Sequence, residues 1–152
     1  AFCLPDPTLT IPLLSKVVQT PGLLLFLFED EPHYRQVLLD GRSHPADLDP
    51  TWMGHSIGRW EKDTLVVDTI GFNDKSWLIF ATGLPHNEML HMTERYRRID
   101  RGHLKVDLKL EDPGAFIQPV ERHTTWELAP GEQILESICT ENNRYRENAG
   151  VK

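Results

Sequence analysis

The sequence has no long apolar segment and no excess of positive charge. Its longest uninterrupted apolar run is Leu23–Phe28, whose six residues are far too few to cross a bilayer as a helix. Sixteen Lys and Arg residues stand against 23 Asp and Glu residues, which gives a net charge of −7. Because such a chain is repelled by phosphate backbones and anionic lipids, we expect neither a nucleic acid nor a membrane as its partner.

Cysteine is also scarce. Cys3 and Cys139 lie near opposite ends of the chain, and neither belongs to a CxxC or Cys–His pattern of zinc-finger spacing. Two free thiols in a cytosolic protein are one interpretation. A disulfide is the other, and it is favoured because the chain opens on Ala1, as a processed chain would, and its first residues have no other obvious anchor. A bridge of this span would contribute on the order of 4–5 kcal/mol in the loop-entropy model and would require an oxidising compartment.

The domain organisation follows from proline placement and composition. Residues 1–22 carry four prolines, which predicts an extended arm packed on the domain rather than a helix. Residues 23–152 are predicted to form one domain, because a chain of 152 residues with 39% hydrophobic and 26% charged residues is typical of a single soluble globular unit.

Hydrophobic alternation and turn residues predict an all-β fold without a convincing helix. Even spacing, short links and an even strand count favour an eight-stranded antiparallel up-and-down barrel of the calycin type, with a two-sheet sandwich as the alternative. The eight expected strands are residues 23–28, 34–40, 52–60, 64–72, 89–99, 104–111, 119–128 and 133–140.

Three carboxylates fall on strand faces that the alternation assigns to the core. Asp68, Glu94 and Glu136 each lie between apolar residues two positions away. A buried carboxylate is costly unless it is paired, hydrogen-bonded or protonated. Three of them predict a polar-lined interior that holds a ligand, whereas an error of one residue in a face assignment is the alternative interpretation.

Polar residues concentrate in two long loops, 42–51 and 73–88, which both adjoin the predicted hairpin 52–72 at its open end. We therefore expect a pocket mouth there, near His55. A histidine beside carboxylates has the tunable pKa that proton transfer needs, so His55, Asp68 and Glu94 are the candidate catalytic residues of a lyase-, isomerase- or cyclase-type enzyme. The expected substrate-binding residues are His44, Trp52, Arg59, Asn73, Trp77 and Glu136. A non-catalytic carrier of a small hydrophobic ligand is the alternative.

A metal-dependent enzyme is a third hypothesis. His44, His86, Glu88 and His91 could supply the histidines and carboxylate that catalytic metals use, but no HExxH or H-x-H pattern is present. We therefore expect no cofactor.

One formal motif, Gly54-His55-Ser56-Ile57-Gly58, matches the G-x-S-x-G nucleophile elbow of serine hydrolases. That elbow requires a strand, a sharp turn and a helix, whereas here the motif is predicted to lie along a strand. The two glycines are instead expected to permit a bend or close packing against Trp52 and Trp60.

A longer motif string resembles a family of hypothetical bacterial proteins, many of them exported. It covers most of the chain and comprises Asp40–Arg42, His44-Pro45, Asp49–Glu61, Asp63–Thr69, Gly71–Asp74, Pro85-His86, Glu94-Arg95, Asp112-Pro113, Cys139 and Glu141–Asn143. Members of the family carry cysteines that match Cys3 and Cys139. The resemblance therefore implies a disulfide and a secreted or periplasmic location, but it implies no activity. Gly58-Arg59-Trp60 is also similar to the G-x-W of lipocalins, although that motif lies on their first strand.

Overall fold

The computed structural model describes residues 14–29, 34–78 and 84–135, and within them every regular element is a β-strand. Among these residues no helix is long and apolar enough to cross a membrane. The strands are β1 (Leu14–Thr20), β2 (Leu23–Phe28), β3 (Tyr34–Leu38), β4 (His55–Glu61), β5 (Thr64–Ile70), β6 (Trp77–Leu78), β7 (Leu84–Pro85), β8 (His91–Arg98), β9 (His103–Glu111) and β10 (Val120–Glu127).

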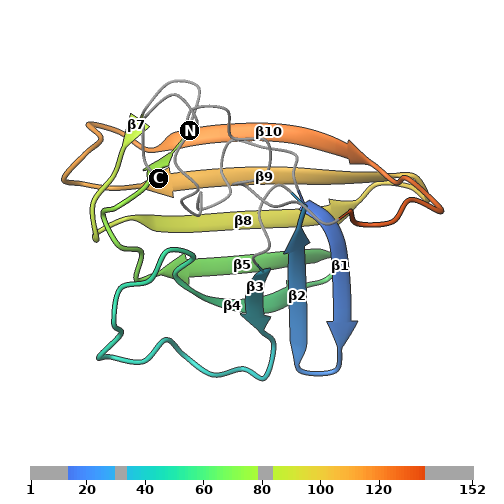
Figure 1. Cartoon of the computed structure of the whole chain (residues 1–152), viewed down its shortest axis with the longest axis horizontal. Helices are drawn as coiled ribbons and strands as arrows, with labels where there is room; N and C mark the ends of the chain where they lie inside the picture. The colour runs from blue at the N-terminus through green and yellow to red at the C-terminus, as the bar shows by residue number, and fades with distance from the viewer. Residues whose placement is uncertain (1–13, 30–33, 79–83, 136–152) are drawn as a thin grey trace, which may run out of the picture.

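Eight of the strands form one curled sheet in the order β1-β2-β3-β4-β5-β8-β9-β10, and β6 and β7 form a separate small hairpin. All neighbours in the large sheet run antiparallel except β3 and β4, which are parallel. The parallel pair arises because the connection 39–54 carries the chain back before β4 begins. The all-β prediction is confirmed. The closed, wholly antiparallel barrel is wrong, because the sheet is mixed and open, a half-barrel (Figure 1).

The strand at one edge differs from expectation. Residues 14–20, within the expected arm, form β1 and pair antiparallel with β2. Of the expected strand 133–140, residues 133–135 are not in a strand, and the remainder lies outside the described residues. Cys3, Cys139 and Glu136 also lie outside them. The sheet therefore reaches eight strands through β1, and the Cys3–Cys139 bridge stays a prediction.

The core lies between the first three strands and the rest of the sheet. Figure 1 shows β1 and β2 running steeply across the long strands β5 and β8. Side chains from both layers pack together there, including Phe26 and Val37 from one layer and Val67, Tyr96 and Val106 from the other. Burying each large apolar side chain contributes roughly 1.5–3 kcal/mol.

A second cluster closes the other end of the sheet. It contains Phe72, Leu78, Leu90, Met92 and Leu110, all at most 1% exposed. Leu84 of β7 packs on it. The β6–β7 hairpin therefore acts as a cover over the end of β8 and β9.

Register decides which carboxylates face the core. β5 and β8 pair Val67 with Glu94 and Asp68 with Thr93, so Glu94 and Asp68 project from opposite faces of the sheet. Glu94 is buried in the interior, as expected. The interior position expected for Asp68 is wrong: its side chain lies on the outer face.

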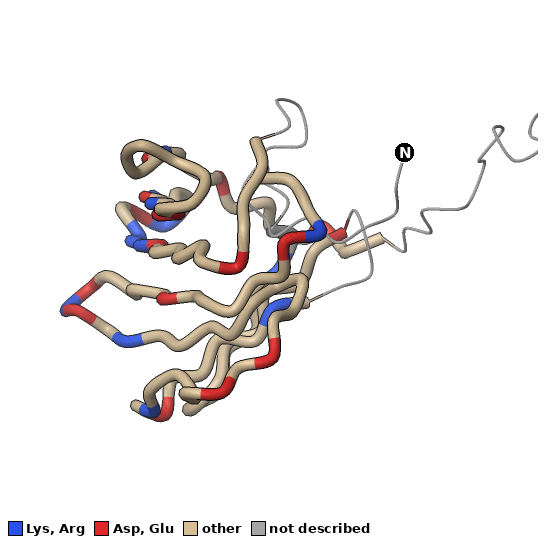
Figure 2. The backbone as a smooth tube through the Cα atoms, turned by 90° about the vertical axis from the view of Figure 1, so that its left-hand side faces the viewer, with Lys and Arg blue, Asp and Glu red and all other residues tan. Residues whose placement is uncertain are grey.

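The neighbouring residue Val66 explains why Asp68 was assigned to the wrong face of the sheet. This residue lies on the outer face between Arg59 and Arg95 in the register, yet it is only 1% exposed. Both arginines donate hydrogen bonds to Glu61 and so span the strand above Val66. The consecutive apolar residues of β5 therefore conceal the alternation. Figure 2 shows acidic and basic residues interspersed along the strands.

Candidate functional site

Four titratable side chains meet on the outer face of the sheet, and we call them the histidine cluster: His44, His55, Asp68 and His91. His55 opens β4, Asp68 lies on β5 and His91 opens β8. His55 pairs with Ile70, two residues beyond Asp68, so both side chains leave the same face. His44 comes from the connection 39–54 and closes over them.

The cluster forms a chain of close contacts. The Nδ1 atoms of His44 and His55 lie 2.8 Å apart. On the other side of His44, its Nε2 lies 3.9 Å from Asp68 Oδ2, too far for a direct hydrogen bond. His91 Nε2 lies 2.6 Å from Asp68 Oδ1. The order in space is therefore His55, His44, Asp68, His91.

The side chain of His44 is more enclosed than that of His91. Its side chain is 15% exposed, against 40% for His91. Burial lowers the pKa of His44 and outweighs the opposing attraction of Asp68, and the neighbouring His55 and His91 lower it further. His44 is therefore neutral at neutral pH.

The charge of Asp68 selects one arrangement of protons in the cluster. A lone pair on His44 Nε2 would be repelled by the facing carboxylate, whereas an N–H there is attracted to it. With its proton on Nε2, His44 must accept a hydrogen bond at Nδ1 from His55. The proton of His55 is then on Nδ1, so its Nε2 carries a free lone pair. His55 is thus placed as a base, oriented by His44 and Asp68.

Glu94 takes no part in this cluster. In the interior its carboxylate accepts hydrogen bonds from Arg35 Nη2 at 2.6 Å and from the Tyr96 hydroxyl at 2.6 Å. Burial and the Glu94 charge raise the pKa of Tyr96 well above its usual value. Burial opposes the charge on Arg35, but Glu94 and Tyr96 outweigh it and raise the pKa of that guanidinium. The expected trio of His55, Asp68 and Glu94 is therefore divided between two faces.

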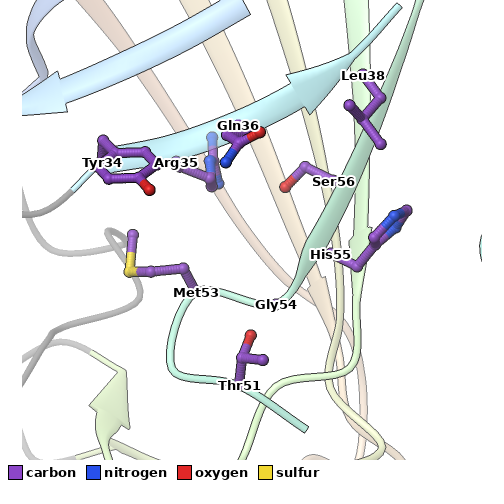
Figure 3. A pocket seen from close by; sticks show the side chains of 9 residues that line it. All are labelled: Tyr34, Arg35, Gln36, Leu38, Thr51, Met53, Gly54, His55 and Ser56. Atoms are coloured by element: carbon purple, nitrogen blue, oxygen red, sulfur yellow. The ribbon is translucent and has the colours of Figure 1, made fainter. Parts of the chain in front are cut away.

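A pocket of about 460 Å³ lies between β3 and the start of β4. Tyr34, Arg35 and Leu38 line it from β3, and Met53 and Ser56 line it from the other side (Figure 3). His55 also borders the pocket, but Figure 3 shows its ring turned away from Arg35. The alternation of residues 34–40 places Arg35 on the same face as Val37, and this is the signal that could have identified the arginine from sequence.

The other expected binding residues that the structure describes lie apart from the histidine cluster. Arg59 is exposed and bonded to Glu61, and Trp77 is 59% exposed on β6. Asn73 is buried, and its side-chain oxygen accepts the Lys75 amide hydrogen. Trp52 is half-buried in the connection before β4. Of the expected binding residues that the structure describes, only His44 is brought to His55 and Asp68.

The four expected metal ligands are not gathered in one place. His86 is buried, and its Nε2 lies 2.9 Å from the Ser76 hydroxyl, while Glu88 is exposed. Across residues 14–29, 34–78 and 84–135, no three His, Cys, Asp or Glu side chains are placed to hold a metal ion. Asp112, which was not among the expected site residues, is buried nearby, and its carboxylate accepts hydrogen bonds from the backbone amides of Asn87 and Gly114.

The residues that match G-x-S-x-G have structural roles. Ser56 is buried within β4, with its hydroxyl 2.8 Å from that of Thr69. Gly54 has a φ of 66°, a left-handed conformation that bends the chain into the strand. At Gly58 an added Cβ would lie 2.8 Å from Val37 and 2.7 Å from Leu39. The glycines therefore serve a bend and close packing, the latter against β3 and Leu39 rather than against the expected tryptophans.

No protein-family model, curated protein or solved structure matches this chain.

Proposed function

We propose that the protein is an enzyme that performs acid–base chemistry on a small organic molecule at the histidine cluster. The observation that carries the proposal is the contact order His55–His44–Asp68, in which one half-buried neutral histidine separates the other, the base, from a carboxylate. This arrangement fixes the ring orientation and tautomer of a catalytic base, which is what general base catalysis requires.

The roles follow from the positions of the atoms. His55 Nε2 takes a proton from a substrate carbon next to a carbonyl group, and the electron pair of the broken C–H bond moves toward the carbonyl. The positive charge then developing on His55 is shared through its Nδ1–H with His44, whose Nε2–H faces Asp68. Returning the proton to another carbon completes an isomerisation, and loss of a neighbouring leaving group completes an elimination. His91 holds the Asp68 carboxylate in position.

Isotope exchange tests the proposal without knowledge of the natural substrate. The protein is incubated in D₂O with ketones, aldehydes and keto acids that carry hydrogens next to the carbonyl, and deuterium uptake is read by mass spectrometry. A base that removes these protons introduces deuterium even where no net reaction is visible. We expect H55Q to lower the exchange by roughly 10²–10⁴-fold.

His123 provides a matched control for this experiment. It is an exposed histidine on β10 with its Nδ1 2.7 Å from Asp107, so it is also a histidine paired with a carboxylate. We expect H123Q to exchange as fast as the unaltered protein. Exchange no faster than buffer, or equal loss in both variants, would contradict the proposal.

A non-catalytic ligand-binding role is the second candidate. One observation favours it: the pocket beside β3 is lined by a different set of side chains from those that contact one another in the histidine cluster, with only His55 bordering both.

A further inference from the structure

The pocket beside β3 shares a face of the sheet with the histidine cluster. Ile57 pairs with Leu38 of β3 and with Asp68 of β5, so the side chains of these three residues leave the same face. Gln36 and His55 come two residues before Leu38 and Ile57 on their strands, and alternation places them on this outer face too. A molecule held between Gln36 and His55 therefore lies next to the proposed base.

Space for such a molecule exists because β3 and β4 separate. Along these two strands the residue pairs are Val37–Ser56 and Leu38–Ile57, and the pocket of about 460 Å³ lies where the pairing ends. Figure 3 shows the His55 ring and the Ser56 side chain on opposite sides of β4, so His55 belongs to the outer wall of the pocket. The volume is within the usual range for small-molecule sites.

The side chains that line the pocket are mostly uncharged. Tyr34, Gln36 and Thr51 are exposed, and none of their side chains forms a hydrogen bond to another described residue. Hydroxyl and amide groups both donate and accept hydrogen bonds, so they are suited to the hydroxyl groups of a ligand. Leu38, Met53 and the ring of Tyr34 supply apolar surface for its carbon atoms.

Arg35 is the charged member of the lining, and its charge is already balanced. Its side chain is directed to the interior, where it is 2% exposed and lies 2.6 Å from Glu94. An anionic substrate therefore finds no free cation among the described lining residues, and the nearby Asp68 carboxylate repels it. A cation gains little either, because the Asp68 oxygens already face His44 and His91.

We propose that the substrate of the acid–base reaction is an uncharged hydroxycarbonyl compound, a ketose or an aldose, whose hydroxyl groups bind Tyr34, Gln36 and Thr51. The inference rests on the proposed function, because it names the substrate of the same base, His55. The uncharged polar lining carries it, since this lining matches hydroxyl groups and offers nothing to a carboxylate.

The reaction that this substrate permits is an isomerisation. His55 Nε2 takes the proton from a carbon that carries a hydroxyl group and adjoins the carbonyl. The C–H electron pair forms a carbon–carbon double bond, and the carbonyl oxygen takes a proton from water, which gives an enediol and a hydroxide ion. The hydroxide then removes the proton of the original hydroxyl group, while the former carbonyl carbon receives the proton held by His55. Ketose and aldose thus interconvert without an oxidant or a reductant.

Matched carbonyl compounds test the substrate class by deuterium uptake in D₂O. Dihydroxyacetone is compared with hydroxypyruvate, and fructose with fructuronate, because each acid replaces one CH₂OH group of its neutral partner by a carboxylate. Acetone lacks the hydroxyl groups. The exchange lost in H55Q is divided by the rate with free imidazole, which corrects for the acidity of each compound. We expect each neutral sugar to exceed its acid, and dihydroxyacetone to exceed acetone, by at least about tenfold.

The outcomes separate the substrate class from the function. Exchange that depends on His55 but is as fast with the acids or with acetone would overturn the substrate class and leave the acid–base function standing. If none of the five compounds shows exchange that depends on His55, the function and this inference both fail.

Gln36→Lys supplies the cation that the pocket lacks. We expect each acid to gain at least about tenfold in exchange relative to its neutral partner. Q19K is the matched control, because Gln19 is an exposed glutamine on β1, which does not adjoin β3 in the sheet, and the ratio should stay unchanged there. Urea denaturation confirms that both variants fold. An unchanged ratio in Q36K would place the substrate away from Gln36 and overturn the assignment.

Discussion

His44 and His55 face each other through their Nδ1 atoms at 2.8 Å, although one comes from a long connection and the other begins a strand. Only one of the two nitrogens can carry the shared proton while both rings are neutral. The Asp68 carboxylate beyond His44 assigns that proton to His55. Long-range ¹H–¹⁵N spectra distinguish the tautomers directly, and we expect Nδ1–H on His55 and Nε2–H on His44.

Removing the Asp68 charge lowers the pKa of His44 further. Burial, His55 and His91 all lower that pKa, and Asp68 is the one neighbour that raises it. We therefore expect the His44 ring to titrate at lower pH in D68N than in the unaltered protein, as followed by its Cε1 proton signal. The H123Q variant, altered on β10, serves as the control and leaves the titration unchanged. A midpoint in D68N at or above the original would contradict the assigned geometry.

The lowered pKa of His44 also makes the fold sensitive to acid. In the unfolded chain this histidine binds a proton near its ordinary value of about 6.5, whereas in the folded protein it stays neutral to lower pH. The unfolded state therefore binds more protons in this window, and the free energy of unfolding falls as the pH drops through it. Urea denaturation from about pH 7.5 to about pH 5 should show a shallower fall for H44Q than for the unaltered protein. Parallel curves would count against the half-buried position of His44.

Glu94 stabilises the interior by balancing Arg35. Glu94→Ala leaves a buried guanidinium without its counter-charge, which should lower the free energy of unfolding by about 3–5 kcal/mol. Replacing both partners, as in R35M/E94L, removes the charge problem and should recover much of this loss. The exposed change E61A should cost far less. Urea denaturation compares the free energies of unfolding of the three variants. A double variant no more stable than E94A would contradict the idea that the loss in E94A comes from the unbalanced charge of Arg35.

Much of the fold could be predicted because strand alternation is a local property. Met92 and Tyr96 in the expected strand 89–99, and Val106 and Leu110 in the expected strand 104–111, follow the alternation, and all four are buried. The parallel pairing of β3 and β4 could not be predicted, because it depends on the path of the connection 39–54 and not on either strand. β1 was missed because four prolines dominate the first 22 residues, although residues 13–20 contain none.

The site could be predicted in part. Loops beside the central hairpin were expected to bring His44 near His55, and they do so. Asp68 joins them, but from the outer face, because the buried Val66 conceals the alternation of β5. Glu94 was correctly placed in the interior, yet its partner Arg35 is 59 residues away in sequence. Alternation identifies a face, but it does not identify which distant side chain will compensate a charge.

We propose from the sequence that Cys3 and Cys139 form a disulfide. Such a bridge implies a secreted or periplasmic location. Intact mass of the purified, unreduced protein should be lower by two hydrogens than after reduction, and alkylation without reductant should label neither cysteine. Reduction should also lower the urea midpoint, because the bridge would restrict the unfolded chain. Two labelled thiols in the unreduced protein would refute the bridge.

Gly58 determines how closely β4 approaches β3, and a single methyl group tests this. An alanine Cβ there would lie 2.7 Å from Leu39 Cδ2 and 2.8 Å from Val37 Cγ1. Leu39 is only partly buried and can rotate away, but Val37 is fully buried and β-branched, so its χ1 is restricted. Overpacking of this kind costs about 1–3 kcal/mol. We expect G58A to lose that amount in urea denaturation.

Gly22, in the turn between β1 and β2, provides the matched control for this substitution. An added Cβ would meet no atom within 4 Å there, so G22A should leave the free energy of unfolding nearly unchanged. β3 and β4 share only two residue pairs, Val37–Ser56 and Leu38–Ile57, so the strain in G58A should separate the two strands locally before the sheet unfolds. Faster hydrogen exchange of amides in β3 than in β9 would record this separation. Equal stability of G58A and G22A would mean that the strands already have room for a side chain, and would contradict the packing role of Gly58.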